Sequence, residues 1–579
     1  MDKKILKNII DVAANRKDAD LVIKNCKIVD VYNSSIIDGK AIAIVDGYIA
    51  GIGDYRGKRE VDAKGNYVSP GFIDGHIHIE SAYVTPEEIG RLLVPHGTTT
   101  IIADPHEIVN VCGMDGLNYM LEAAKKTELN IKYMLPSCVP ATPFENSGAV
   151  IDSTAMIEPI KNDNILGLGE FMDYPGVTQA KEEVLNKLLV AINEGKIVDG
   201  HSPGLTGHKL NAYAAARIRT DHECSTIEEM QERIRCGLYI LLREGSACHN
   251  LRSLLKGVSK ENSRWCLLCS DDRQPKTILE LGHIDNHLQI CVEEGIDAIT
   301  AIQMATINAA QCYELKDRGA IAPGLRADIV MIEDLINFRA NRVWIQGKEI
   351  AREGCYLPKV ERFDISNVAG RFKIGNFTID KLKLQLNSNR VNVINILPGG
   401  VVTEKETETV TLDEAGCFVY QPEKDIVKIA VVERHNNTGN VSVALLKGYG
   451  IKAGAIALSI AHDSHNIIVV GTNDEDMAFA VEQLVEQSGG IILIQDKEII
   501  SHMPMVVGGI MSDQTGEWVN ERLTQIHEIA RTRLGVSKEV EPVMTLCFMS
   551  LAVIPEIKIT DMGLFDVTKF NFISVEAKE

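Results

Sequence analysis

The sequence predicts an α/β protein: a TIM-like (β/α)8 barrel, a small β-sandwich domain formed by segments on both sides of it, and a C-terminal α/β domain. Residues 70–318 alternate short apolar strands with amphipathic helical stretches, over nearly the ~250 residues typical of such a barrel. Residues 1–69 and 319–357 both show short β-like runs broken by Gly, Pro and Asn turns, so we expect them to form one β domain. Residues 358–579 mix strands and helices, which predicts a separate domain.

Composition limits the kinds of partner. The 579 residues exceed what one hydrophobic core usually supports, and the formal charge of -20 repels polymeric nucleic acids and anionic membrane surfaces. The first residues lack an apolar leader segment, and the longest apolar run, residues 543–554, is too short to span a bilayer. Thirteen cysteines without a framework spacing fit a reducing compartment. We therefore expect a soluble cytoplasmic protein.

The predicted barrel strands end in polar or ionisable residues. Structural strands have no reason to end this way, whereas barrels of this class assemble their active sites at the carboxyl ends of their strands. The pattern therefore predicts an active site at that face of the barrel. The eight expected strands are FIDGHIHI, TTTIIAD, IKYMLPS, ILGLGE, KIVDGH, RIRTDHE, GSACHNL and LLCSDD.

Two histidines in the first barrel strand give the sharpest chemical signal. His76 and His78 are two residues apart, so in a strand they point to the same side and can bind one metal ion. Imidazole pairs suit zinc, iron or manganese. His201, His222 and Asp271, at the ends of expected strands five, six and eight, are further donors. Each of these three alone could be a capping or surface residue, but together they predict a metal site.

This pattern of one H-x-H pair, two later histidines and a final aspartate resembles the ligand set of the amidohydrolase superfamily. The segment GAIAPGLRADIVMIEDL is similar to the closing segment of that superfamily. Many members carry a carboxylated lysine at the end of strand four, where this chain has Glu170. That glutamate, together with HIES, ADPHEI, DGHSPGL, RTDHE and CSDDR, resembles the bacterial adenine deaminase family, which also has a C-terminal domain.

The resemblance implies a reaction and a cofactor. It implies that a metal-activated hydroxide deaminates adenine to hypoxanthine and ammonia in purine salvage. It also implies two divalent ions, Mn2+ or Fe2+ with Zn2+ as an alternative, and a homo-oligomer, either a dimer or a tetramer. The implied metal ligands are His76, His78, Glu170, His201, His222 and Asp271. Asp271 is also the expected catalytic residue, because a group that takes a proton from water can return it to the leaving amine. Candidates for substrate binding or for orienting the ligands are Glu80, His106, Glu107, Asp272 and His283.

Two other functions fit the same residues. Another amidohydrolase acting on a cyclic amide or an N-acetyl group would use the same ligands, and a catalytically dead scaffold could keep the fold. Cys266 and Cys269 lie in a short apolar run and are expected to be buried strand residues. His462 and His465 in AHDSHN resemble a metal pair, but we expect loop residues unless the C-terminal domain folds back over the barrel mouth.

Overall fold

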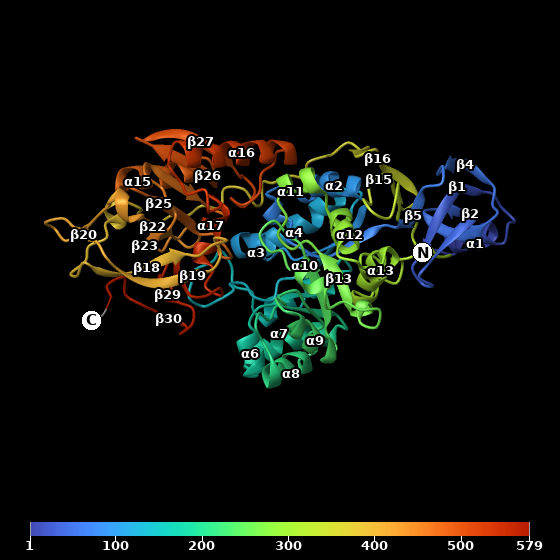
Figure 1. Ribbon diagram of the computed structural model, residues 1–579, viewed down its shortest axis with the longest axis horizontal. Coiled ribbons are helices and arrows are strands. Elements are labelled where there is room, and N and C mark those ends of the chain that lie inside the picture. The colour runs from blue at the N-terminus through green and yellow to red at the C-terminus, as the bar shows by residue number, and fades with distance from the viewer. Residues whose placement is uncertain (1, 578–579) are drawn as a thin grey trace.

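Eight parallel strands form a closed barrel in the middle of the computed structural model, which describes residues 2–577 (Figure 1). The strands are β6 (Phe72–Ile77), β7 (Thr98–Ala103), β8 (Asn130–Leu135), β9 (Ile165–Phe171), β10 (Ile197–Gly200), β11 (Thr220–Asp221), β12 (Tyr239–Arg243) and β13 (Cys266–Cys269). They pair in chain order from β6 to β10 and from β11 to β13. Backbone hydrogen bonds close both seams: Asp271 N donates to His76 O at 2.9 Å, and Arg219 N donates to Val198 O at 2.9 Å.

One end of the barrel is filled with apolar side chains. Residues from β6, β7, β8, β10, β12 and β13 form one buried cluster with α14 (Ile307–Cys312). Helices cover the outside of the barrel. They include α2 (Pro86–Leu93), α4 (Met114–Ala123), α7 (Glu182–Asn193), α8 (Gly207–Ala215), α9 (Ile227–Arg235), α10 (Leu251–Leu255), α12 (Ile284–Glu293) and α13 (Ala298–Met304). Because apolar packing fills that end, the polar side chains gather at the carboxyl ends of the strands.

The expected seventh strand was wrong. It was expected at GSACHNL, but the strand is β12, Tyr239–Arg243, and residues 245–250 form the loop that follows it. The run YILLR can bury apolar side chains and pair with both neighbours, whereas GSACHNL is short of apolar residues. Arg243 is therefore the polar residue at this strand end, and His249 pairs with Glu244 in the loop.

The two segments that flank the barrel share one nine-stranded sheet. β5 (Tyr67–Pro70), which leads into the barrel, pairs antiparallel with β14 (Ile329–Ile332), which follows it. The other strands are β1 (Ala19–Asp30), β2 (Ser35–Val45), β3 (Tyr48–Gly53), β4 (Gly57–Asp62), β15 (Ala340–Ile345), β16 (Lys348–Arg352) and β17 (Cys355–Tyr356). Helix α1 (Lys3–Ala13) buries Ile9 and Val12 against this sheet. This unit lies at one end of the molecule in Figure 1.

The C-terminal part contains an eight-stranded, mostly antiparallel sheet in the order β19-β18-β23-β22-β25-β24-β26-β27. These strands are β18 (Arg390–Ile396), β19 (Thr403–Thr409), β22 (Ile426–Val432), β23 (Val441–Lys447), β24 (Ala455–Leu458), β25 (Ile467–Gly471), β26 (Gly490–Gln495) and β27 (Glu498–Pro504). Three helices accompany them: α15 (Asp474–Glu486), α16 (Gly516–Thr532) and α17 (Met544–Cys547). A three-stranded sheet follows, made of β28 (Ile557–Thr560), β29 (Gly563–Asp566) and β30 (Asn571–Phe572).

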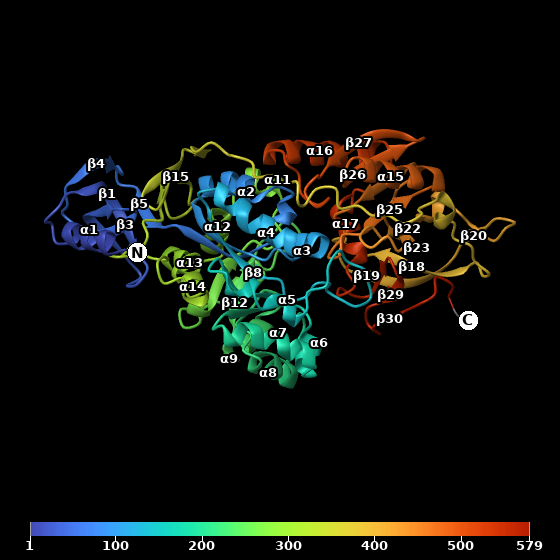
Figure 2. The ribbon, with the colours of Figure 1, turned by 180° about the vertical axis from the view of Figure 1, so that it is seen from behind.

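The C-terminal part folds back onto the mouth of the barrel. In both views, α17 lies beside α3 (His106–Cys112), the helix that follows barrel strand β7 (Figure 1, Figure 2). The loop of residues 459–466, between β24 and β25, also reaches this helix, since His465 Nε2 lies 3.5 Å from Glu107 Oε2. Among residues 2–577, no helix is both long and apolar enough to cross a membrane.

Candidate functional site

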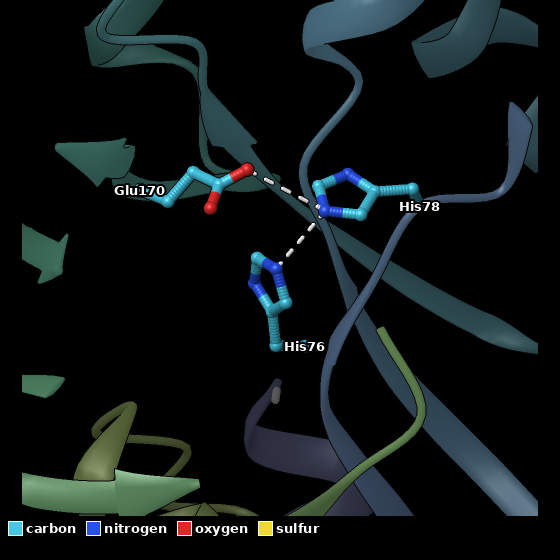
Figure 3. A group of neighbouring side chains, drawn as sticks. All are labelled: His76, His78 and Glu170. Atoms are coloured by element: carbon cyan, nitrogen blue, oxygen red, sulfur yellow. Dashed lines mark hydrogen bonds and ion pairs between the residues drawn. The ribbon is translucent and has the colours of Figure 1, made fainter. Parts of the chain in front are cut away.

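The two histidines of the first barrel strand point at each other and at Glu170. His76 Nε2 and His78 Nε2 are 3.1 Å apart, and Glu170 Oε1 lies 3.5 Å from His78 Nε2 (Figure 3). All three side chains are buried. The strand geometry explains the pair, because residues two apart share one face of a strand. His78 Nδ1 faces the carbonyl oxygen of Asp104 at 2.9 Å, and this contact fixes the orientation of its ring.

Glu170, at the end of β9, stands between two sets of imidazoles. Its Oε1 faces His78 and also His106 Nδ1, which is 3.4 Å away. Its Oε2 lies 2.7 Å from His201 Nδ1 and 3.2 Å from His222 Nε2. One carboxylate therefore lies close to imidazoles from four other parts of the barrel.

Asp271 completes the ring of donors from the end of β13. Its Oδ1 lies 3.2 Å from His78 Nε2 and 3.8 Å from His76 Nε2. Its Oδ2 accepts a 2.7 Å hydrogen bond from Arg243 Nη1. The backbone of Asp271 has a φ of 55°, in the left-handed region that a non-glycine residue rarely adopts, and such outliers concentrate at functional sites.

Charge sets the protonation of these groups. Burial alone would raise the pKa of the Glu170 carboxyl, but the imidazoles of His201 and His222 hold it well below its ordinary value. Burial likewise opposes ionisation of Asp271, yet the Arg243 guanidinium and the His78 imidazole keep its pKa well below the usual range. Burial and the neighbouring His222 and His78 lower the pKa of His76 well below its ordinary value. Although burial opposes it, the carboxylates in turn raise the pKa of His78 and His222, and raise that of His201 to about 9. Binding of metal ions to these imidazoles would therefore release protons.

The spacing of the six donors fits divalent cations. Two ligand atoms held ~2.1 Å from a zinc ion at a tetrahedral angle lie ~3.4 Å apart. The contacts that Glu170 and Asp271 make with the four histidines span 2.7–3.8 Å, around this value. Three sets also have all their ligand atoms within 4.8 Å of one another: His76, His78 and Glu170; His76, His222 and Asp271; Glu170, His201 and His222. Imidazole and carboxylate donors suit zinc, iron and manganese.

Sequence reasoning missed two charged residues that hold this cluster. Glu223 Oε1 lies 3.3 Å from His222 Nε2 and accepts a 2.5 Å hydrogen bond from Arg243 Nη1. The same arginine nitrogen binds Asp271, so Arg243 links the ends of strands β11 and β13. Glu223 directly follows the predicted ligand in RTDHE and could have been noticed. Arg243 was missed because the seventh strand was expected later in the chain than β12, which Arg243 ends.

A cavity of about 280 Å³ opens beside these donors. Barrel residues form part of its wall, among them His106, Glu107 and Asp272. The C-terminal part forms the rest, including His462, Asp463 and Phe548. Phe548 stacks on the His462 ring, with centroids 4.9 Å apart. The cavity is therefore built by both parts of the chain.

The other predicted candidates divide by position. His106, Glu107 and Asp272 line the cavity, and Ser81 Oγ lies within hydrogen-bond distance of both Glu107 Oε1 and Asp272 Oδ1. Glu80 is buried but does not line the cavity; burial and the nearby Glu107 carboxylate raise its pKa to about 8.

His283 lies outside the cavity. Its Nε2 is 3.0 Å from Asp74 Oδ2, and its Nδ1 is 2.8 Å from Thr98 Oγ1. The structure therefore places His283 against strands β6 and β7, away from the cluster of donors. His462 and His465, in contrast, are brought to the barrel mouth because the C-terminal part folds over it.

Comparison with known proteins agrees with this architecture. Residues 67–350 match the amidohydrolase family, and residues 400–571 match the adenine deaminase C-terminal domain. The chain is 66% identical over 577 residues to adenine deaminase 2 of Desulfotalea psychrophila, covering 100% of both chains. It is 51% identical over 577 residues to adenine deaminase of Ligilactobacillus salivarius, again covering 100% of both. It is 47% identical over 573 residues to adenine deaminase of Nitratidesulfovibrio vulgaris, covering 99% of both. The predicted fold class and resemblance are confirmed: this chain belongs to the adenine deaminase family of amidohydrolases.

Proposed function

We propose that this chain hydrolyses adenine to hypoxanthine and ammonia, a purine salvage reaction, in the cavity between the barrel and the C-terminal part. The observation that carries the proposal is the carboxylate of Glu170 between two sets of imidazoles, with Asp271 beside them at the wall of the cavity. The names of the full-length relatives support the choice of adenine.

We propose two divalent ions, Mn2+ or Fe2+ with Zn2+ as an alternative, held by His76, His78, Glu170, His201, His222 and Asp271. When bound in such a donor set, divalent ions lower the pKa of a coordinated water and so supply hydroxide near neutral pH. Glu170 would help to hold both ions, because its Oε1 faces His78 and its Oε2 faces His222.

Asp271 is the proposed proton carrier. It takes a proton from the attacking water while a new C–O bond forms at C6 of adenine. It then delivers that proton to the exocyclic nitrogen as the C–N bond breaks, so that adenine and water give hypoxanthine and ammonia. Arg243 holds one oxygen of Asp271 and leaves the other facing the histidine pair. A fixed carboxylate beside the leaving group suits this double role.

A proton donor to the purine ring would aid the attack by drawing electron density away from C6. We assign this role to Asp272, from the candidates that line the cavity. It would protonate N1 during the attack and recover a proton from the new C6 hydroxyl as the carbonyl of hypoxanthine forms. Burial and the neighbouring Asp271 carboxylate raise the pKa of Asp272, which favours a protonated carboxyl able to donate. Ser81 contacts Asp272 and fixes its position.

The test is ammonia release from adenine by protein loaded with manganese or ferrous iron, with adenosine and cytosine as alternative substrates. Rapid release from adenine alone is expected. Release from a cyclic amide or an N-acetyl substrate instead would favour another amidohydrolase activity. A protein that binds no metal and hydrolyses none of these compounds would favour a scaffold.

We also propose a cytoplasmic homo-oligomer, a dimer or a tetramer. The cytoplasmic location rests on the thirteen cysteines, which are free thiols in the structure. The oligomer rests on resemblance to barrels of this type. Light scattering coupled to gel filtration measures the mass in solution, and a monomeric mass would contradict this part of the proposal.

A further inference from the structure

A second group of metal-binding side chains lies where the C-terminal part meets the barrel. Glu107, in helix α3 of the barrel, faces two histidines from the loop of residues 459–466. Glu107 Oε1 is 3.7 Å from His462 Nδ1, and Glu107 Oε2 is 3.5 Å from His465 Nε2. The ligand atoms of these three residues all lie within 4.8 Å of one another. None of the three belongs to the six ligands proposed above.

These separations suit an intervening ion better than direct hydrogen bonds. A hydrogen bond between a charged nitrogen and a carboxylate is ~2.7–2.9 Å long. Two donors on a tetrahedral zinc ion lie ~3.4 Å apart, close to the observed values. Glu107 is also held in place, because Ser81 Oγ donates a 3.1 Å hydrogen bond to its Oε1.

His465 supplies independent evidence. Its side chain is fully buried, yet neither ring nitrogen has a hydrogen-bond partner among residues 2–577. Buried polar groups are nearly always paired, because an unpaired one loses its contacts with water without compensation. A buried imidazole with free ring nitrogens is suited to bind a metal ion.

We propose that Glu107, His462 and His465 bind a further divalent cation, best matched by zinc, in addition to the ions of the barrel. Two imidazoles and one carboxylate form a common zinc ligand set, which leaves a fourth position for water or substrate. Glu107 and His462 line the cavity, so the fourth position opens toward it. The ion would join the barrel to the C-terminal wall of the cavity.

Metal analysis of the full chain tests this site. The protein is loaded with zinc, desalted and compared with a His465→Gln variant. The variant is expected to bind one zinc equivalent per chain fewer than the wild type, whatever number the barrel holds. A His502→Gln variant is the matched control, because His502, on β27, contacts Gln487 at the end of α15, away from the group. It should keep the wild-type zinc content. Equal zinc content in the wild type and the His465→Gln variant would overturn the proposal.

A second measurement needs no variant, so it decides the question even if His465→Gln does not fold. Crystals of the zinc-loaded wild type are measured on both sides of the zinc absorption edge. An anomalous peak ~2.1 Å from a His465 ring nitrogen supports the site. No peak there overturns it. Neither zinc content nor the anomalous peak depends on adenine turnover. Both therefore test this metal site even if the protein does not deaminate adenine.

Discussion

Arg243 Nη1 donates a 2.7 Å hydrogen bond to Asp271 Oδ2, while the other oxygen of the same carboxylate lies 3.2 Å from His78 Nε2. The arginine therefore fixes the carboxylate and stabilises its charged form. Since only the ionised form of Asp271 can accept a proton, Arg243 should set the lower pH limit of activity.

The Arg243→Met variant tests this relationship. An arginine beside a carboxyl lowers its pKa by about 1–3 units. Its removal should raise the pKa of Asp271, so the acidic limb of the kcat/KM profile should move to higher pH by about the same amount. The measurement is deamination rate against pH. Arg219→Met, which removes an ion pair with Glu314 outside the cavity, is the control. An unchanged acidic limb in Arg243→Met would mean that another group controls it.

Replacing Asp271 with asparagine should remove the proton carrier. General acid–base catalysis contributes about 10²–10⁴-fold to rate, so kcat should fall by about that factor. Ammonia release is the measurement, with metal content determined on the same sample to separate ligand loss from loss of proton transfer. Asp54→Asn, at an exposed position of the N-terminal sheet, should retain full activity. Activity of Asp271→Asn within about tenfold of the wild type would exclude this residue as the proton carrier.

Glu170→Gln tests the shared carboxylate. The neutral amide keeps the shape of the side chain but cannot place a negative charge between the two sets of imidazoles. We expect fewer metal equivalents per chain and little deamination, measured by elemental analysis and ammonia release. Glu183→Gln, at a surface helix N-terminus, is the matched control. If Glu170→Gln bound the full complement of metal, the bridging role would be wrong.

The Phe548→Ala variant tests whether the C-terminal part shapes the substrate site. Phe548 lines the cavity and stacks on His462. Because a purine can stack on this ring, its removal should cost about 0.5–1.5 kcal/mol of adenine binding, so KM for adenine should rise by up to about tenfold. Steady-state kinetics measure the change. Phe418→Ala, on the small hairpin strand β21 (Phe418–Val419) away from the cavity, should leave KM unaltered. An equal effect of both substitutions would indicate general destabilisation.

Glu145 should make stability fall with pH. Burial raises the pKa of its carboxyl to about 8, against an ordinary value of 4.5, so the folded state holds a proton that the unfolded state releases. The free energy of unfolding should therefore decrease as pH rises from about 4.5 to 8 and then level off. Glu145→Gln should weaken this decrease, as measured by denaturant unfolding at several pH values. A variant with the same pH dependence as the wild type would exclude Glu145 as a contributor.

The sequence by itself determined the parts of the site that rest on local periodicity. His76 and His78 lie on one face because strand side chains alternate, and Glu170 could be placed because it ends an apolar run. Seven of the eight observed barrel strands overlap the expected segments, each an apolar run that ends in polar residues. The seventh strand was expected at GSACHNL, beyond the true strand β12, because polar residues lie on both sides of the end of β12. Arg243 was therefore missed.

Only the tertiary structure decided which distant residues meet. Glu107 and His465 are 358 positions apart and lie 3.5 Å from each other, a contact that no hydrophobic period encodes. The same docking brings Asp463 and Phe548 to the cavity. His283 shows the converse: its residue type suited the site, but packing against β6 and β7 holds it elsewhere. Periodicity specifies which face of an element is buried, whereas the packing of whole elements determines which polar groups share a cavity.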